Sequence, residues 1–217
     1  MKKLFLIALG IVVATAGLAF ASGTQKEVGG EAAKGNTHPF NASKAATRFQ
    51  CMWYQNEIDE SGPITKIEFK FHSYVGSGAT NFDGYTVILC HSSKDKLTND
   101  FKKNYDFKTP VTVSEGALTI PGNLTQDDWY TVCTPTSTFS YNNRNNMLME
   151  IIWTSGEGAD RVLSWISTKD QPGRVRAFNA TAATGLLLAD QGQIARITIS
   201  KPAVSPTSLG RIRALYN

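Results

Sequence analysis

Apolar and polar residues alternate with a period of two along much of the chain, in short runs separated by clusters of Gly, Pro, Asn and Asp. The clearest run is residues 66–72, where Ile67, Phe69 and Phe71 share one side and charged or polar residues share the other. This alternation is typical of a β-strand. Because one side is apolar and the other polar, we expect the strand to belong to an antiparallel sheet with one solvent-exposed face.

The same reasoning predicts further strands at residues 48–53, 85–91, 111–113, 117–120, 129–133, 147–153, 162–167, 175–178 and 194–199. About ten short strands, with turn signals between most of them, predict an all-β fold: a jelly-roll-like antiparallel β-sandwich. Asn81 to Gly84 has the composition of a hairpin turn. Residues 94–105 fit either a helical turn or a solvated loop at one end of the sandwich.

The amino end has the pattern of a signal peptide over residues 1–21. Met1, Lys2 and Lys3 precede an apolar run that closes on Ala19-Phe20-Ala21, a small-x-small cleavage pattern. A retained membrane anchor is the alternative, since about 18 apolar residues are close to the minimum for a span. Small residues within the run and the absence of a basic stop after it favour cleavage, so we expect a secreted protein, extracellular or periplasmic.

Composition divides the rest of the chain into three parts. Residues 22–37 have almost no bulky apolar groups and predict a flexible leader. Residues 38–200 hold the strand pattern and predict the β-sandwich domain. Residues 201–217 begin with Pro202, contain three basic residues and no acid, and predict a basic-apolar carboxyl-terminal tail.

Charge and composition exclude several classes of protein. The chain has 217 residues, of which 41% are apolar and 18% are charged, too apolar for a disordered protein and too sparsely charged for a coiled coil. Cleavage would remove Lys2 and Lys3 and halve the formal net charge of +4. We therefore expect no nucleic-acid partner and no membrane partner after cleavage. The expected partners are an extracellular polysaccharide or other surface proteins, contacted through the tail.

Three cysteines, Cys51, Cys90 and Cys133, would lie in an oxidising compartment. One disulfide and one free thiol can form, and the sequence does not select among the three pairings. Simple burial of the thiols is the alternative. The spacing fits neither a zinc nor an iron-sulfur site, and we expect no cofactor and no metal centre of this kind.

Several short motifs resemble a β-sandwich domain of unknown function that recurs in secreted and surface-sorted bacterial proteins. They are Asn36-Thr37-His38-Pro39-Phe40, residues 47–50 leading to Asn56-Glu57-Ile58, residues 61–67, residues 86–89, and the run from Lys96-Leu97-Thr98 to Phe101 and Asn104. The resemblance covers residues 36–155 and implies an extracellular domain with no assigned chemistry. The chain departs from the sorted versions in having no apolar anchoring helix at its carboxyl end.

The usual catalytic sets are not apparent in the sequence. No G-x-S-x-G motif occurs, Ser77 lacks the flanking pattern of a nucleophile, and His38, His72 and His91 are expected at the surface. Acidic residues suited to glycoside hydrolysis fall in expected turns, where solubility and capping explain them: Glu57, Asp59, Glu60, Asp127, Asp128, Glu157 and Asp160. Loop carboxylates leave a structural calcium as an open alternative.

Glu150 differs from the other acids because it interrupts the apolar run 147–153. If its side chain is buried it needs a partner such as an arginine.

Aromatic and basic residues could instead form a binding surface. Trp53, Trp129, Trp153 and Trp165 lie in predicted strands and are expected to fill the core. The aromatic residues of predicted loops are better candidates for stacking on sugars: Tyr74, Phe82, Tyr105 and Tyr141. Arg161, Arg174 and Arg176 could form a cationic platform near Trp165, or simply lie on a solvated face.

Together these features predict a non-enzymatic protein with an adhesive, structural or surface-associated role outside the cell. A carbohydrate-binding module is the alternative, and an extracellular hydrolase is a third hypothesis that requires a cleft with convergent histidines or carboxylates.

Overall fold

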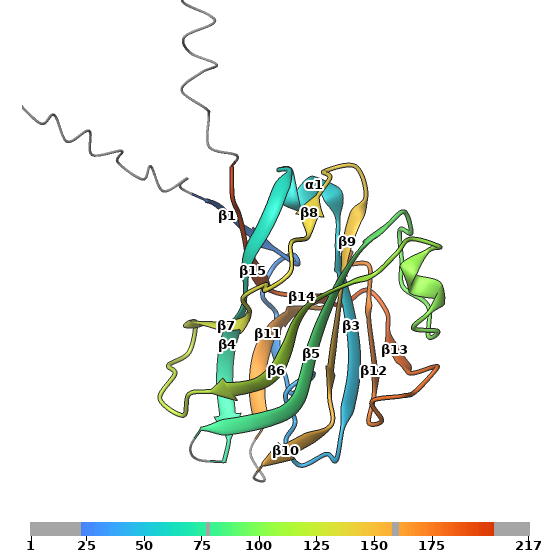
Figure 1. The fold of residues 1–217 in the computed structure, drawn as a ribbon. Coiled ribbons are helices and arrows are strands. Elements are labelled where there is room, and N and C mark those ends of the chain that lie inside the picture. The colour runs from blue at the N-terminus through green and yellow to red at the C-terminus, as the bar shows by residue number, and fades with distance from the viewer. Residues whose placement is uncertain (1–22, 77–78, 158–160, 202–217) are drawn as a thin grey trace, which may run out of the picture. The chain divides into compact units, whose positions relative to one another are not determined.

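A computed structural model of the chain describes residues 23–76, 79–157 and 161–201 (Figure 1). These residues fold as an antiparallel β-sandwich, and Ser22–Pro202 forms one compact unit. The predicted signal peptide, most of the predicted tail and residues Ser77 and Asp160 lie outside the described residues. No helix within the described ranges is both long enough and apolar enough to cross a membrane.

One sheet has eight strands, in the order β1-β15-β4-β11-β14, with β2 paired to β11 and with β7 and β8 paired to β4. The strands of this sheet are β1 (Thr24–Val28), β2 (Lys34–Asn36), β4 (Gly62–Val75), β7 (Trp129–Cys133), β8 (Ser140–Tyr141), β11 (Arg161–Ser167), β14 (Gly192–Gln193) and β15 (Ala195–Ile199).

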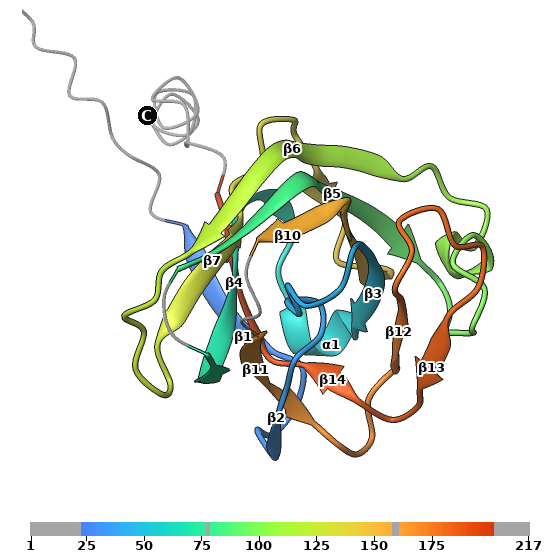
Figure 2. The same cartoon turned by 90° about the horizontal axis from the view of Figure 1, so that it is seen from below.

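The second sheet has seven strands, in the order β10-β5-β9-β3-β12-β13, with β6 paired to β5. Its strands are β3 (Thr47–Trp53), β5 (Thr80–Ser92), β6 (Val111–Ile120), β9 (Asn146–Trp153), β10 (Ser155–Glu157), β12 (Arg174–Ala177) and β13 (Leu186–Leu188). The helical elements are α1 (Gln55–Ile58) and the 3-10 helix η1 (Lys103–Tyr105). Figure 2 shows the strands of the two sheets arranged around a shared interior.

Inward-facing residues of both sheets fill that interior. Phe69 and Phe71 of β4 face Phe49 and Trp53 of β3 across one apolar cluster, and all four are buried. Phe40, from the segment before β3, closes one side of the cluster, where its ring lies 5.4 Å from the ring of Phe82. The interior is dense with aromatic rings, which supply much of the apolar area that stabilises the fold.

The prediction of an all-β antiparallel sandwich is confirmed, but the number and length of the strands differ. The described residues contain fifteen strands, and β4 and β5 span 14 and 13 residues. Asn81 to Gly84, predicted to be a hairpin turn, lies inside β5. The register shifts between Asp83 and Tyr85 at this point, and Gly84 has a φ of 57°, so the turn-like residues form a β-bulge.

The prediction of a flexible leader over residues 22–37 is wrong, and so is the predicted domain start at residue 38. Thr24 to Val28 pairs with β15, and Lys34 to Asn36 pairs with β11. These edge strands are held by backbone hydrogen bonds and bury few side chains, so they lack an apolar pattern by which the sequence could reveal them.

Candidate functional site

The segment between β5 and β6, residues 93–110, crosses the outer face of the seven-stranded sheet; we call it the 93–110 loop (Figure 1). Leu97 and Phe101 are buried against Met52, Leu148 and Val175, which project outward from that sheet. For residues 94–105 the sequence allowed either a helical turn or a solvated loop. The structure is nearer to the loop, with η1 as the only helical element of this segment. Its buried residues Leu97 and Phe101 pack on the sheet, while many of its other residues are exposed to solvent.

A buried ionic cluster lies beneath this loop, centred on Glu150 of β9. The Glu150 carboxylate is fully buried and accepts hydrogen bonds from Arg48 Nε at 2.7 Å, Gln50 Nε2 at 2.5 Å and Tyr105 Oη at 2.7 Å. Gln50 and Glu150 are direct neighbours in the register of β3 and β9. The prediction that a buried Glu150 needs an arginine partner is confirmed.

Asn104 extends this cluster into the loop. Its side-chain nitrogen donates to Gln50 Oε1 and to the Thr98 carbonyl, both at 2.9 Å. Its side-chain oxygen accepts from the Thr98 backbone nitrogen at 2.8 Å and from the Thr98 hydroxyl at 2.9 Å. Since Asn104 is fully buried and uses both ends of its amide, it ties the loop firmly to the sheet.

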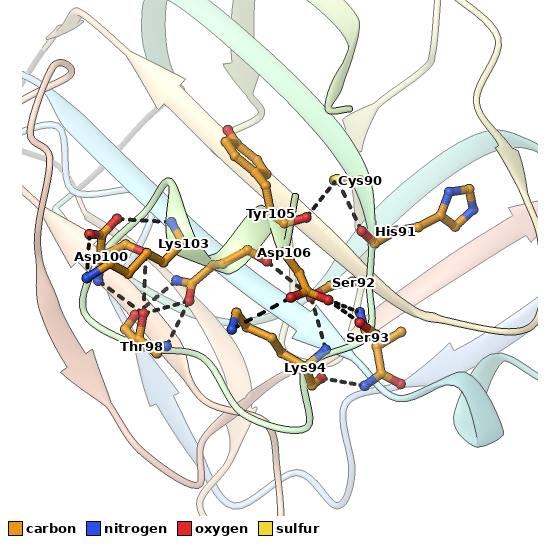
Figure 3. A network of polar contacts seen from close by, with 12 residues as sticks. Cys90, His91, Ser92, Ser93, Lys94, Thr98, Asp100, Lys103, Tyr105 and Asp106 are labelled. Atoms are coloured by element: carbon orange, nitrogen blue, oxygen red, sulfur yellow. Dashed lines mark hydrogen bonds and ion pairs between the residues drawn. The ribbon is translucent and has the colours of Figure 1, made fainter. Parts of the chain in front are cut away.

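Figure 3 shows the next set of contacts along the same loop. Asp106 accepts hydrogen bonds from the backbone nitrogen and the hydroxyl of Ser93. The hydroxyl of Ser92 donates to the Asn104 carbonyl at 3.1 Å, and Lys94 Nζ lies 3.8 Å from Asp106. Both ends of the loop are therefore fastened near the end of β5.

Phe107 follows this fastened segment and projects into solvent. Its relative exposure is 106%, and both Asp106 and Phe107 have a left-handed backbone, with φ of 52° and 59°. A non-glycine residue in this region costs roughly 1–2 kcal/mol. The loop thus holds an apolar ring in water on a strained but well-anchored backbone, which is typical of a contact residue.

The three cysteines have the properties of structural residues. All three are buried free thiols, so no disulfide joins Cys51, Cys90 and Cys133, and the expectation of a bridge is not met. Burial raises the pKa of Cys90 to about 11 and that of Cys133 to about 12, and it also raises the pKa of Cys51. Thiols protonated at neutral pH are poor nucleophiles.

An open hollow of about 480 Å³ lies between the segments 30–33 and 167–171. Its titratable residues are Glu31, Lys169 and Asp170, all exposed, and none of its lining residues is a histidine. The hydrolase hypothesis requires histidines or carboxylates that converge in a cleft, whereas this hollow is lined by no histidine and its two carboxylates, Glu31 and Asp170, are exposed to solvent. In the ranges covered by the structure, no group of three or more His, Cys, Asp or Glu could hold a metal ion.

The histidines and acids of the sequence fall at separate places. His38 is buried, contrary to the prediction, while His72 and His91 are half-buried. Asp127 and Asp128 lie in an exposed turn, where Asp128 accepts a hydrogen bond from the Thr125 backbone nitrogen at 2.8 Å. These acids act as turn and capping groups, as expected.

The aromatic predictions are partly wrong. Phe82 and Tyr141 are buried in β5 and β8 rather than exposed in loops, because the segments around them pair as strands. Tyr74 and Tyr105 are half-buried, and the Tyr74 hydroxyl bonds to the Pro121 carbonyl. Trp53 and Trp153 fill the core as predicted, whereas Trp129 and Trp165 are half-buried.

The three arginines do not form a single platform. Arg161 is exposed on β11 of the eight-stranded sheet, whereas Arg174 and Arg176 lie on β12 of the other sheet. Arg174 is fully buried, and Arg176 is half-buried.

Sequence reasoning missed Phe107, Asn104 and Gln50. Phe107 stands alone among polar residues, so no periodicity marks it. A bulky aromatic residue between Asp106 and Lys108, shortly before Pro110, is the signal that could have revealed it. Gln50 lies on the polar side of a predicted strand, where a loop from elsewhere in the chain covers it.

Comparison with known proteins adds no relatives: no protein-family model matches the chain, and no curated protein matches it. The resemblance to surface-protein sandwiches therefore remains a prediction from the motifs alone.

Proposed function

We propose that this protein is a secreted, non-catalytic β-sandwich with an adhesive or surface-associated role, and that the 93–110 loop carries its principal contact. The observation that supports this most is Phe107, a fully exposed apolar ring on a left-handed backbone anchored by buried hydrogen bonds. Secretion is proposed from the pattern of residues 1–21.

The energetics of Phe107 favour a contact role. In the free protein the ring gains no burial while its backbone is strained. Burying a phenylalanine side chain against a partner stabilises the complex by about 1.5–3 kcal/mol. Because the cluster around Asn104 and Tyr105 already orders the loop, little conformational entropy is lost on binding.

Exposed lysines next to the ring suggest the character of the partner. Lys102, Lys103 and Lys108 are all exposed around Phe107, and only Lys103 has an acidic neighbour within 4.0 Å in the part of the chain that the structure describes, Asp100 at 3.6 Å. A partner surface with an apolar recess and an acidic rim would complement this arrangement.

The test compares exported wild-type protein with Phe107→Ser in cells that produce the full chain. We expect most of the wild type to stay attached to the washed cell surface and most of the variant to appear in the medium. Leu186→Ser is the matched control, because Leu186 is 55% exposed but is not one of the residues with a left-handed backbone. Equal retention of all three proteins would contradict the role of Phe107, and intact masses that retain residues 1–21 would contradict export with cleavage.

A carbohydrate-binding function is the second candidate, and a different surface favours it. On the outer face of the eight-stranded sheet, Arg196 Cζ and Lys70 Nζ lie 4.8 and 6.0 Å from the ring centre of Trp129. The rings of His72 and Trp165 lie 4.4 Å apart. Half-buried tryptophans flanked by polar groups are suited to stacking on sugar rings. A glycan array with wild type and Trp129→Ala tests this function, and no binding by the wild type would reject it.

A further inference from the structure

A second group of residues, three of them cations, lies where β12 approaches β14 and the segment before β3. It consists of His38, Lys44, Arg174, Arg176 and Phe178, and we call it the cationic cluster. Arg174 and Arg176 project to the same side of β12, because they are two residues apart in a strand. Val175, between them, packs under the 93–110 loop on the outer side, so both arginines face the interior of the sandwich.

Arg174 is a fully buried charge with neutral partners only. Its Nη1 donates to Gln193 Oε1 at 3.3 Å and its Nη2 to Gln191 Oε1 at 2.7 Å, while its Nε has no partner among the residues that the structure describes. Burial lowers the pKa of Arg174 to about 10, so the group stays positive at neutral pH. The two glutamines explain why the side chain bridges the sheets, but they leave the charge uncompensated.

His38 lies beside these arginines and also has an unused nitrogen. It is 7% exposed, its ring centre lies 5.4 Å from that of Phe178, and its Nδ1 has no hydrogen-bond partner. Burial, then the charges of Arg176, Arg174 and Lys44, lower the pKa of His38 to about 3. The imidazole is therefore neutral and can donate one N–H.

Phe178 holds the remaining two cations at the surface. Its ring is 44% exposed, and Lys44 Nζ and Arg176 Cζ lie 4.8 and 5.0 Å from its centre. The Nε of Arg176 is buried without a partner. Within the described ranges, none of Lys44, Arg174 and Arg176 forms an ion pair with a carboxylate. Two positive charges, Lys44 and Arg176, thus gather around the Phe178 ring. A third, Arg174, lies on the same side of β12 with its Cζ 5.9 Å from the ring centre of Phe49, and none of the three is balanced by an acid of the described residues.

We propose that the cationic cluster is a binding site for an oxyanion, and that its ligand is an acidic saccharide carrying carboxylate or sulfate groups. An oxyanion would accept from the unused N–H groups of Arg174, Arg176 and His38 and would balance the buried charge. The exposed edge of Phe178 offers an apolar surface to the sugar ring. The oxyanion follows from the side chains alone, whereas the choice of a saccharide rests on the proposed extracellular function.

The experiment is calorimetric titration of the mature protein with three probes: tetragalacturonate, low-mass dextran sulfate and neutral dextran of similar length. We expect binding of one or both acidic probes and none of neutral dextran. Binding of tetragalacturonate identifies the carboxylate as the source of the oxyanion, and binding of dextran sulfate alone identifies the sulfate ester. Absence of binding to both acidic probes would overturn the proposal.

Matched variants locate the binding. Arg176→Gln and Lys44→Gln should each weaken it about tenfold or more, in line with the loss of one hydrogen bond to a charged group. Lys102→Gln, an exposed lysine of the 93–110 loop, should leave it unchanged. Equal weakening by Lys102→Gln would overturn the assignment to this site. Phe107→Ser should also bind normally, so failure of the proposed adhesive contact is distinguishable from failure of this site.

A second measurement needs no variant. NMR titration of the His38 ring should show a pKa that rises when the acidic saccharide is present, because the bound anion stabilises the imidazolium form. An unchanged His38 titration at saturating ligand would show that the ligand binds elsewhere and would overturn the proposal.

Discussion

The ionic cluster around Glu150 and the cationic cluster each contain one fully buried charged side chain, Glu150 and Arg174, yet within the described residues only Glu150 has an opposite charge as its partner. Glu150 has an arginine, a glutamine and a tyrosine as donors, all from the same fold. Arg174 has two amide oxygens and one unused N–H, and its charged neighbour is Arg176. The charges of the first cluster fasten a loop, while those of the second have no opposite charge beside them in the described residues.

This difference bears on function because buried polar groups are nearly always satisfied in folded proteins. A cluster whose polar groups are all paired with one another within the fold is explained by its structural role. A cluster that gathers uncompensated cations and unused donors in the described part of the chain is better explained by a ligand that is bound during function. We therefore expect substitution of Glu150 mainly to lower the stability of the fold, and substitution of Arg174 mainly to weaken ligand binding.

The largest effect is expected from Glu150→Ala. The change leaves Arg48, Gln50 and Tyr105 without their shared acceptor, and removing one partner of a buried ion pair costs about 3–5 kcal/mol. We expect about 3 kcal/mol, the lower end, because the Arg48 side chain is 18% exposed and retains some hydration. Urea unfolding measures the loss, and limited proteolysis should show new cleavage in the 93–110 loop.

Glu115→Ala is the control for this variant, since Glu115 is exposed on β6. It should change the free energy of unfolding by no more than about 0.5 kcal/mol. A loss below about 1 kcal/mol in Glu150→Ala would mean that the cluster is not a structural fastening, and the contrast with Arg174 would disappear.

Sequence patterns predicted the strands that contain an apolar alternation or run of several residues and missed strands that are very short or have no such pattern. The strands β3, β7, β9 and β11 were predicted to within a residue at each end, because apolar residues alternate or run through them. The strands β1 and β2 were missed, since Thr, Gln, Lys and Gly give no apolar period. The strands β13 and β14 were also missed, because two or three residues are too few to show a period, even where they are leucines, as in β13, or buried, as in β14.

The residues of the two clusters also differ in whether the sequence revealed them. Glu150 stood out in the sequence because a carboxylate in an apolar strand requires compensation. Its partners Gln50 and Asn104 did not stand out, since their meeting depends on the register of β3 with β9 and on the path of a distant loop. Arg174 and Arg176 were noticed as alternating cations, but the lack of a counter-charge became visible only when their neighbours were placed.

The next largest effect is expected in the pH dependence of stability, through His38 of the cationic cluster. The folded pKa of His38, about 3, lies below its ordinary value of 6.5, so the unfolded chain binds a proton in this window and the folded protein does not. Above pH 6.5 His38 is neutral in both states and does not reduce the free energy of unfolding. As the pH falls from 6.5 toward 3, His38 lowers the free energy of unfolding by up to about 1.4 kcal/mol per pH unit. The charged groups that face His38 are Arg176, Arg174 and Lys44.

The measurement compares urea unfolding of wild type and His38→Gln between pH 7 and 4.5. Glutamine keeps an N–H donor but does not titrate, and the two proteins share every other titratable group. The stability of the wild type relative to the variant should therefore fall as the pH is lowered. Parallel pH profiles would show that His38 is not held neutral by burial and the three cations.

The smallest effect is expected from Arg174→Met, and it tests the comparison most directly. Methionine fills similar space and removes a buried charge that has no acid partner, which is favourable. Gln193 and Gln191 lose a donor, which is unfavourable, so the net loss should be about 1 kcal/mol, well below that of Glu150→Ala. Saccharide binding should nevertheless fall tenfold or more, because Nε and its charge are gone. A stability loss equal to that of Glu150→Ala would mean that the charge of Arg174 is compensated within the fold. The cationic cluster would then be balanced by the protein itself, as the cluster around Glu150 is.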